Sequence, residues 1–152
     1  MDVISFDSLR NQGNLVLKND GIIVKAKKSW IIAGEDRLAY TTIIELVECC
    51  REYHWQKDIN SVIQGESLDS ICRKISCDFM KPILSETEVF IKYNVIDVGK
   101  KSYSLKLSIF DKFGDHLYAD ITLISVFYDA ISNKSLIPPE RVLNKLKSIM
   151  RG

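Results

Sequence analysis

The sequence SICRKISCDFM, residues 70–80, opens a series of four strand-like runs that fills most of the second half of the chain. The runs that follow it are EVFIKYNVIDV (88–98), SYSLKLSIFD (102–111) and LYADITLISVFYD (117–129). All four are rich in β-branched and aromatic residues, and turn-forming residues such as Gly99 and Gly114 separate them. Strands joined by turns in this way predict an antiparallel meander.

Segments with the helical period lie on both sides of these runs. Between Asp36 and Trp55, apolar residues recur at steps of three and four, which predicts one long helix. The spacing of Thr42 and Glu45 resembles a capping box if Thr42 is the N-cap, and a start a few residues earlier is the alternative. Apolar residues cover much of its circumference, so we expect its middle to be buried on more than one side. After the strands, ERVLNKLKSIM (140–150) predicts a short amphipathic helix.

The remaining segments complete a single domain. GIIVKAKKSWII (21–32) is typical of one further strand, and residues 56–69 indicate an irregular connection. Residues 1–20 contain turn signals and are expected to form an N-terminal appendage. A sheet of about five strands must wrap around one long central helix to bury it. We therefore predict an α+β fold with one domain over residues 21–152.

Charge and composition argue against several kinds of partner. The chain has 152 residues and a net charge of +1, so no long-range field favours nucleic acid or an anionic membrane surface. No apolar run is long enough to span a bilayer, and no signal segment is visible, so we expect a cytoplasmic protein. The spacings of the four cysteines match neither a zinc site nor a redox pair. We expect reduced, mostly buried thiols, no metal and no cofactor.

Five short motifs carry a resemblance to a known family. They are, in chain order, Arg73-Lys74, Phe79-Met80-Lys81-Pro82, Ser85-Glu86-Thr87, Val95 with Gly99 and Ser102, and Tyr128-Asp129. Together with the element order, over residues 22–147, they resemble the 4-hydroxybenzoyl-CoA thioesterase-like branch of the hotdog superfamily. The resemblance extends in particular to bacterial short-chain acyl-CoA thioesterases.

This resemblance implies a fold, an assembly and an activity. In the hotdog fold the helix lies in the curl of the sheet, and two subunits pair edge to edge. The thioester of coenzyme A or of an acyl carrier protein is then hydrolysed at the interface of a homodimer, or of a homotetramer built from two such dimers.

The chain departs from the family pattern where many relatives carry a catalytic aspartate. When Glu48 is aligned with the glutamate of the family's helix, Ala33 or Ile31 falls at the aspartate position. The nearest carboxylates are Glu35 and Asp36.

Thioester hydrolysis needs donors for the developing oxyanion and a carboxylate to activate water. The free amides of Tyr40, Thr41 and Thr42 at the helix start are suited to the first task. Asp36 precedes the helix and is the first candidate carboxylate, although it would equally complement the helix dipole.

Glu48 is the second candidate carboxylate. Without a paired cation, an apolar helix would raise its pKa, as in many general bases, whereas a salt bridge with Arg51 is the alternative. The pair Thr41 and Glu48 also resembles the threonine and glutamate of fluoroacetyl-CoA thioesterase-like hotdogs, with the threonine one residue out of register. Glu45 is interpreted as a cap or surface residue.

Further residues are candidates for substrate binding. Arg73 and Lys74 suit the phosphates of coenzyme A or an acidic carrier protein, although they would equally be solvated strand ends. Tyr40, Ile44 and Phe79 would line an acyl pocket, although such residues more often form plain core.

Three hypotheses follow from the sequence. The first is a thioesterase acting on acyl-CoA or acyl-carrier-protein thioesters. The second is a non-hydrolytic hotdog protein that binds acyl-pantetheine. The third is a hotdog dehydratase or a release enzyme for polyketide or fatty acyl chains. His54, at the helix end, and His116, in a turn, support neither a catalytic triad nor dehydration.

Overall fold

The computed structural model describes residues 4–32 and 34–150. Its main elements are α1 (Phe6–Asn11), β1 (Leu15–Lys18), β2 (Gly21–Lys25), α2 (Tyr40–His54), β3 (Leu68–Phe79), β4 (Glu88–Val98), β5 (Ser102–Asp111), β6 (Leu117–Asp129) and α3 (Glu140–Ile149). Short helical turns lie at Lys28–Trp30, at Asn60–Val62, and at Trp55–Ile59, where the turn is a π-helix that continues directly from α2.

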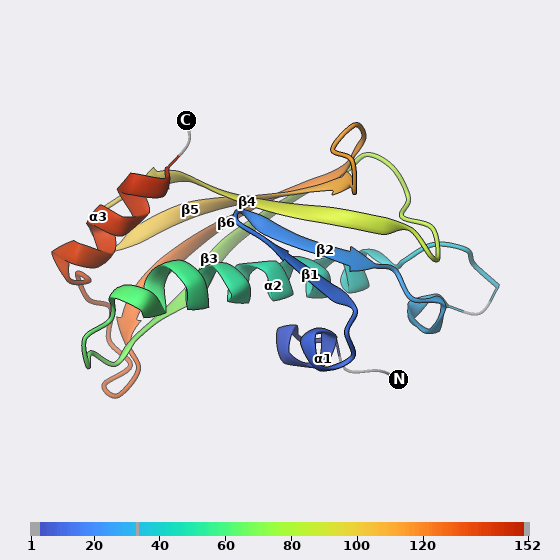
Figure 1. Cartoon of the computed structure of the whole chain (residues 1–152). Coiled ribbons are helices and arrows are strands. Elements are labelled where there is room, and N and C mark those ends of the chain that lie inside the picture. Colours follow the sequence, from blue (N-terminus) through green and yellow to red (C-terminus); the bar gives the residue numbers. More distant parts are fainter. Residues whose placement is uncertain (1–3, 33, 151–152) are drawn as a thin grey trace.

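The strands form one antiparallel sheet in the order β1-β2-β4-β5-β6-β3. The long helix α2 lies against one face of this curved sheet (Figure 1). The predicted α+β architecture, with one central helix in a sheet, is confirmed. The core lies between them, because alternate residues of β4, β5 and β6 are buried and face α2, whose own buried residues include Ile43, Leu46, Val47 and Cys50.

The meander that the sequence predicted holds for β4, β5 and β6 but not for β3. Strand β3 pairs with β6 instead of β4, with Cys77 opposite Ile121, and forms one edge of the sheet. The connection from β3 to β4 spans residues 80–87 and contains Pro82, so no tight turn holds these two strands together as a hairpin. This connection instead runs beside the segment before α2, where the amide of Leu38 donates to the carbonyl of Ile83, before the chain enters β4.

The N-terminal segment adds the sixth strand. Strand β1 pairs with β2, with Leu15 opposite Val24. The preceding helix α1 begins with a capping box between Ser5 and Ser8, and it buries Phe6 and Leu9 in the main core. The strand count is therefore six, where about five were expected.

One predicted boundary was wrong, and the start of the long helix, left open between Thr42 as N-cap and an earlier residue, is the earlier one. The strand expected over residues 21–32 ends at Lys25, and the chain then turns through Lys28–Trp30 to bury Trp30. Helix α2 begins at Tyr40, and its N-cap is Ala39 rather than Thr42. The reason is tertiary, because the backbone amide of Leu38 donates to the carbonyl of Ile83 at 2.9 Å and holds the preceding residues extended.

The cysteines and the surface complete this description. Cys49 and Cys50 are buried, Cys77 is half-buried and Cys72 is exposed. Burial raises the pKa of the Cys49 thiol to about 12. Among the described residues no helix is both long and apolar enough to cross a membrane.

Candidate functional site

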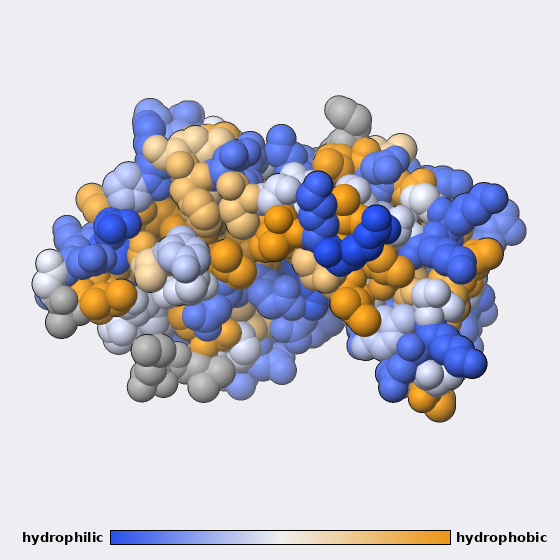
Figure 2. All heavy atoms as spheres, turned by 180° about the vertical axis from the view of Figure 1, so that it is seen from behind, coloured by the Kyte–Doolittle hydropathy of each residue, from blue (hydrophilic) through white to orange (hydrophobic). Residues whose placement is uncertain are grey.

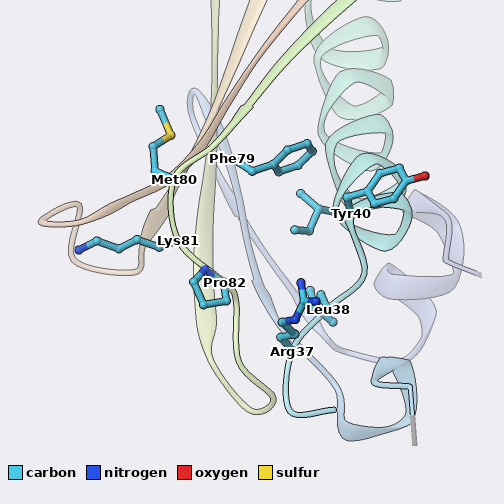
Figure 3. A pocket seen from close by; sticks show the side chains of 8 residues that line it. Arg37, Leu38, Tyr40, Phe79, Met80, Lys81 and Pro82 are labelled. Carbon is cyan, nitrogen blue, oxygen red and sulfur yellow. The ribbon is translucent and has the colours of Figure 1, made fainter. Parts of the chain in front are cut away.

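A cavity of about 490 Å³ opens where the first turn of α2 approaches the end of β3. Figure 3 shows it from close by. Its lining residues come from the segment before α2, the first turn of α2, and the connection after β3, and they are Arg37, Leu38, Tyr40, Ile43, Phe79, Met80, Lys81 and Pro82. The buried side chains of Leu38 and Ile43 form its apolar floor.

Two of the predicted substrate-binding residues meet in this cavity. The rings of Tyr40 and Phe79 lie edge to face, with their centroids 6.4 Å apart and an interplanar angle of 63°. Both side chains are far from fully buried, with Tyr40 64 % and Phe79 45 % exposed. Exposed aromatic side chains beside an apolar floor leave surface available for an apolar ligand group.

The start of α2 supplies hydrogen-bond donors beside the cavity. Ala39 is the N-cap and has no side-chain oxygen, and no acidic residue lies in the first turn. The amides of a helix's first turn have no acceptor within the helix, and here no side chain caps them. The positive end of the helix dipole therefore lies beside the cavity, and no acidic side chain of the first turn offsets it.

Asp36, Thr41 and Thr42 lie near the cavity without lining it. Asp36 is exposed and directly precedes Arg37, and Thr41 is exposed in the first turn of α2. Thr42 is half-buried on the same turn, and its side chain makes no capping hydrogen bond. Ala33, the position aligned with the family's aspartate, lies outside the described residues.

Glu48 and Ile44 face a different hollow. Together with Glu45, Cys49 and Glu52 they line a cavity of about 330 Å³ that extends toward the start of α1. The Nε atom of Arg51 donates to both carboxylate oxygens of Glu48, at 2.9 and 2.8 Å, so the salt bridge given as the alternative for Glu48 is present. Eight residues separate Glu48 from Tyr40, which is about 12 Å along the helix.

Arg73 and Lys74 lie far from the cavity. Both are exposed in the middle of β3, where the pairing with β6 shifts at a β-bulge between Cys72 and Lys74. Six residues separate Arg73 from Phe79, which is roughly 20 Å along a strand.

Strand β3 is an uncovered edge. Most of its side chains are exposed, among them the large apolar Ile71, Ile75 and Phe79. Figure 2 shows the molecule from the side on which β3 lies. Apolar residues form patches on this face, and hydrophilic side chains lie between and across the patches. An edge strand of this length, paired with β6 on one side only, presents a row of free backbone donors and acceptors next to apolar side chains.

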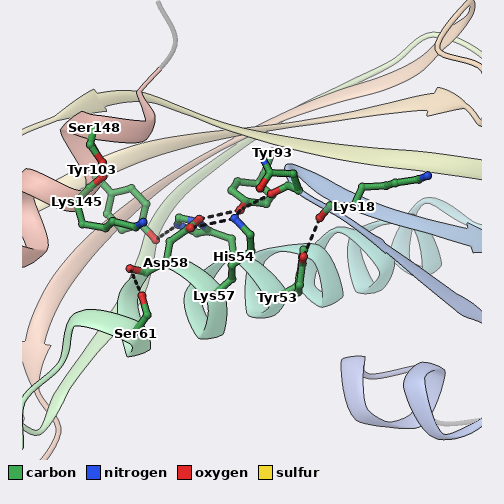
Figure 4. A network of polar contacts seen from close by, with 11 residues as sticks. Lys18, Tyr53, His54, Lys57, Asp58, Ser61, Tyr93, Tyr103, Lys145 and Ser148 are labelled. Carbon is green, nitrogen blue, oxygen red and sulfur yellow. Dashed lines mark hydrogen bonds and ion pairs between the residues drawn. The ribbon is translucent and has the colours of Figure 1, made fainter.

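A buried polar cluster at the other end of α2 was not found by sequence reasoning. His54, which the sequence places at the end of the helix, is fully buried and contacts Asp58 and Tyr103 (Figure 4). The hydroxyl of Tyr93 also donates to Asp58, at 2.8 Å. The spacing of His54 and Asp58, four residues apart at a helix end, was the available signal.

Titration of this cluster follows from its burial. Burial lowers the pKa of His54, and the hydrogen bond to Asp58 opposes this in part. Burial alone would raise the pKa of Asp58, but the hydrogen bonds from His54 and Tyr93 outweigh it and hold this pKa below its ordinary value. The pair is remote from the cavity at the start of α2. Within residues 4–32 and 34–150, no group of three or more His, Cys, Asp or Glu side chains is arranged to hold a metal ion.

Comparison with known proteins gives matches only at the level of structure. No family model and no curated protein sequence matches the chain. The probable thioesterase YbaW from Escherichia coli matches with a TM-score of 0.72 at 14 % identity, over 88 % of this chain and 100 % of that one. Slr0204, a 1,4-dihydroxy-2-naphthoyl-CoA thioesterase from Synechocystis, matches with a TM-score of 0.71 at 10 % identity, over 86 % and 96 %.

A third solved structure is a Thermus thermophilus thioesterase complexed with coenzyme A and zinc. It matches with a TM-score of 0.71 at 14 % identity, over 86 % of this chain and 92 % of that one. These structures are hotdog-fold thioesterases, and their likeness extends over most of both chains. The six-stranded antiparallel sheet around α2 is therefore a hotdog fold.

Proposed function

We propose that this protein hydrolyses the thioester of an acyl-CoA or an acyl carrier protein in the cavity at the start of α2. The observation that carries the proposal is the juxtaposition of an apolar cavity with an uncapped helix start, at Ala39 and Tyr40. The cavity takes the acyl group, and the free amides stabilise the oxyanion that forms when water attacks the carbonyl carbon. The carbon–sulfur bond then breaks, and the leaving thiolate takes up the proton that the attacking water has lost.

A carboxylate must accept the proton of the attacking water, and two residues are candidates for this role. Asp36 directly precedes the cavity residue Arg37, so it would act within its own subunit. Glu48 lies about 12 Å from the start of its own helix, too far for direct contact with a carbonyl held there. Glu48 would therefore act on a thioester bound at the helix start of a second subunit. Thr41, at the helix start, would assist the carboxylate.

A homodimer formed through β3 would permit this arrangement. The strand exposes a free backbone edge and the apolar residues Ile71, Ile75 and Phe79, which a second copy of β3 would cover. Phe79 belongs both to this edge and to the cavity, so pairing of the edges would enclose the cavity between subunits. A tetramer would need a second contact between two such dimers, through a surface other than β3.

Coenzyme A is the carrier favoured by the comparisons. The thioesterase from Thermus thermophilus that shares this fold was solved with coenzyme A, and Slr0204 is named for a CoA thioester. An acyl carrier protein presents the same pantetheine arm, so both carriers remain within the proposal. Arg73 and Lys74 on β3 would contact the carrier if the paired edges bring them close to the cavity of the second subunit.

Thiol release from a panel of acyl-CoA and acyl-carrier-protein substrates tests this function. We expect the wild type to release thiol, and Glu48→Gln or Asp36→Asn to lower kcat by about 100-fold or more, depending on which carboxylate acts. Glu45→Gln is the matched control on the same helix face. If the wild type releases no thiol from any substrate, the proposed hydrolysis is wrong.

A non-hydrolytic acyl-pantetheine-binding protein is the second candidate. The observation that favours it is that none of the eight described lining residues is a carboxylate. Calorimetric titration with acyl-CoA separates the two candidates, because binding without thiol release supports this alternative. Nothing at the cavity favours a dehydratase or a chain-release enzyme, because His54 is buried at the far end of α2 and His116 is in the β5–β6 turn.

A further inference from the structure

Arg37 places a cation inside an otherwise apolar cavity. In Figure 3 its side chain is directed into the space between Pro82 and the rings of Tyr40 and Phe79, whereas Lys81 points away from that space. The eight described lining residues include no acidic side chain. The cavity therefore has a positive charge on its wall without a carboxylate of its own to neutralise it.

The backbone around Arg37 is held by the connection between β3 and β4. Arg37 forms an isolated antiparallel bridge with Leu84, and the amide of Leu38 donates to the carbonyl of Ile83 at 2.9 Å. Leu38 and Ile83 are both buried, so these contacts anchor the segment in the core. A side chain on an anchored backbone loses less conformational entropy when it binds a ligand.

The only ion pair found for Arg37 among the described residues is weak. Its Nε atom lies 3.8 Å from a carboxylate oxygen of Glu35, and the two side chains are 57 % and 45 % exposed. Exposed ion pairs at this distance contribute little and compete poorly with a ligand. The planar N–H donors of the guanidinium group thus remain available, and they match the geometry of a carboxylate or a phosphate.

We propose that Arg37 determines substrate specificity by binding an anionic oxygen that the thioester substrate carries. Two parts of a substrate supply such an oxygen, namely an acid group on the acyl moiety and a phosphate of the coenzyme A or carrier arm. Arg37 acts on binding, not on the reacting bond. This inference rests on the proposed thioester hydrolysis at the same cavity and names what the cavity selects.

Four substrates distinguish the two sources of the anion. They are butyryl-CoA, succinyl-CoA and the N-acetylcysteamine thioesters of the same two acyl groups, which lack every phosphate. The variants are Arg37→Gln, Arg37→Lys and the control Lys147→Gln, which removes an exposed cation on α3 that does not line this cavity. Circular dichroism melting curves establish that each variant is folded.

We expect Arg37→Gln to lower kcat/KM by about 10- to 100-fold for the substrates that carry the recognised anion, mainly through KM. Loss with both CoA thioesters but with neither cysteamine thioester identifies a phosphate. Loss with succinyl thioesters on either carrier, but not with butyryl thioesters, identifies the acyl acid group. Arg37→Lys should recover part of the loss, because it keeps the charge without the planar fork.

Two results would overturn the inference while leaving the hydrolytic function intact. They are an equal loss with all four substrates, which indicates a structural role, and no loss with any of them. If the wild type hydrolyses none of the four substrates, the proposed function fails. The role of Arg37 in binding can then still be tested with two stable thioethers, S-butyl-CoA and S-(3-carboxypropyl)-CoA. Weaker binding of either thioether by Arg37→Gln than by the wild type supports the inference, and equal binding of both contradicts it.

Discussion

His54 and Asp58 form a buried hydrogen-bonded pair, in which Nδ1 of His54 lies 2.8 Å from Oδ2 of Asp58. The Nε2 atom of the same ring lies 3.1 Å from the hydroxyl of Tyr103. With a neutral ring, Nδ1–H donates to the carboxylate and Nε2 accepts from the tyrosine, so every polar atom of the ring has a partner. This arrangement joins the end of α2 to β5, and Tyr93 joins the same carboxylate to β4.

Acidification should destabilise the fold through this pair. Burial lowers the pKa of His54 in the folded state, so the unfolded chain binds a proton first as the pH falls below about 6.5. The free energy of unfolding therefore decreases from about pH 7 downward. The lowered pKa of Asp58 adds a second loss, below the ordinary aspartate pKa of 3.8. Thermal melts between pH 8 and pH 5 measure the first effect, and His54→Gln should flatten it. An equal slope in the variant would assign the effect to other groups.

Removal of the Tyr103 hydroxyl should lower the free energy of unfolding without changing the fold. Tyr103→Phe leaves Nε2 of His54 buried without its partner, and an unsatisfied buried group costs about 1–3 kcal/mol. Urea unfolding measures the loss. Tyr128→Phe is the control, because that hydroxyl is exposed and bonds Asp69 at 3.3 Å, and its removal should change stability by less than about 0.5 kcal/mol.

A side-chain cap on α2 should trade activity for stability. Ala39→Asp would supply the missing N-cap acceptor and stabilise the helix by about 0.5–2 kcal/mol. The same carboxylate would occupy amides that the oxyanion needs, so kcat should fall by about 100-fold. Denaturation midpoints and steady-state kinetics of one variant check both effects. A stabilised variant with unchanged kcat would show that the oxyanion is held elsewhere.

Disruption of the β3 edge should separate the subunits. Ser76→Pro places proline in the middle of the exposed strand. Proline has no backbone N–H to donate, and its ring restricts φ. We expect light scattering to show a monomer, and thiol release to fall with it. Lys18→Pro, in the short strand β1 at the opposite edge, is the control and should leave the dimer intact. A wild type that is itself monomeric would contradict the proposed interface.

Local pattern was sufficient for much of the fold. The predicted strands over residues 88–98, 102–111 and 117–129 coincide with β4, β5 and β6, because alternation and clear turns define them. The position of β3 could not be read in this way, since its neighbour β6 comes about 50 residues later in the chain. The start of α2 depends likewise on Ile83, which is distant in sequence and extends the backbone before Ala39.

The site was predicted only in part. Tyr40 and Phe79 were expected at an acyl pocket and do line one cavity, because both positions adjoin recognisable element ends. Arg37 was missed, although a basic residue just before a helix was visible. The environment of His54 could not be deduced from its place at the helix end, because its burial depends on Tyr93 and Tyr103 from two later strands.

The π-helical turn at Trp55–Ile59 sets the positions of its own side chains around the helix axis, relative to those of α2. Each residue of a regular helix advances by about 100° around the axis, and the wider π-turn changes this phase once, directly after His54. Loss of a single residue there would rotate Asp58 by roughly a quarter of a turn, out of line with the imidazole. The length of this turn is therefore constrained together with the identity of Asp58, so natural variants of the chain should carry no insertion or deletion here.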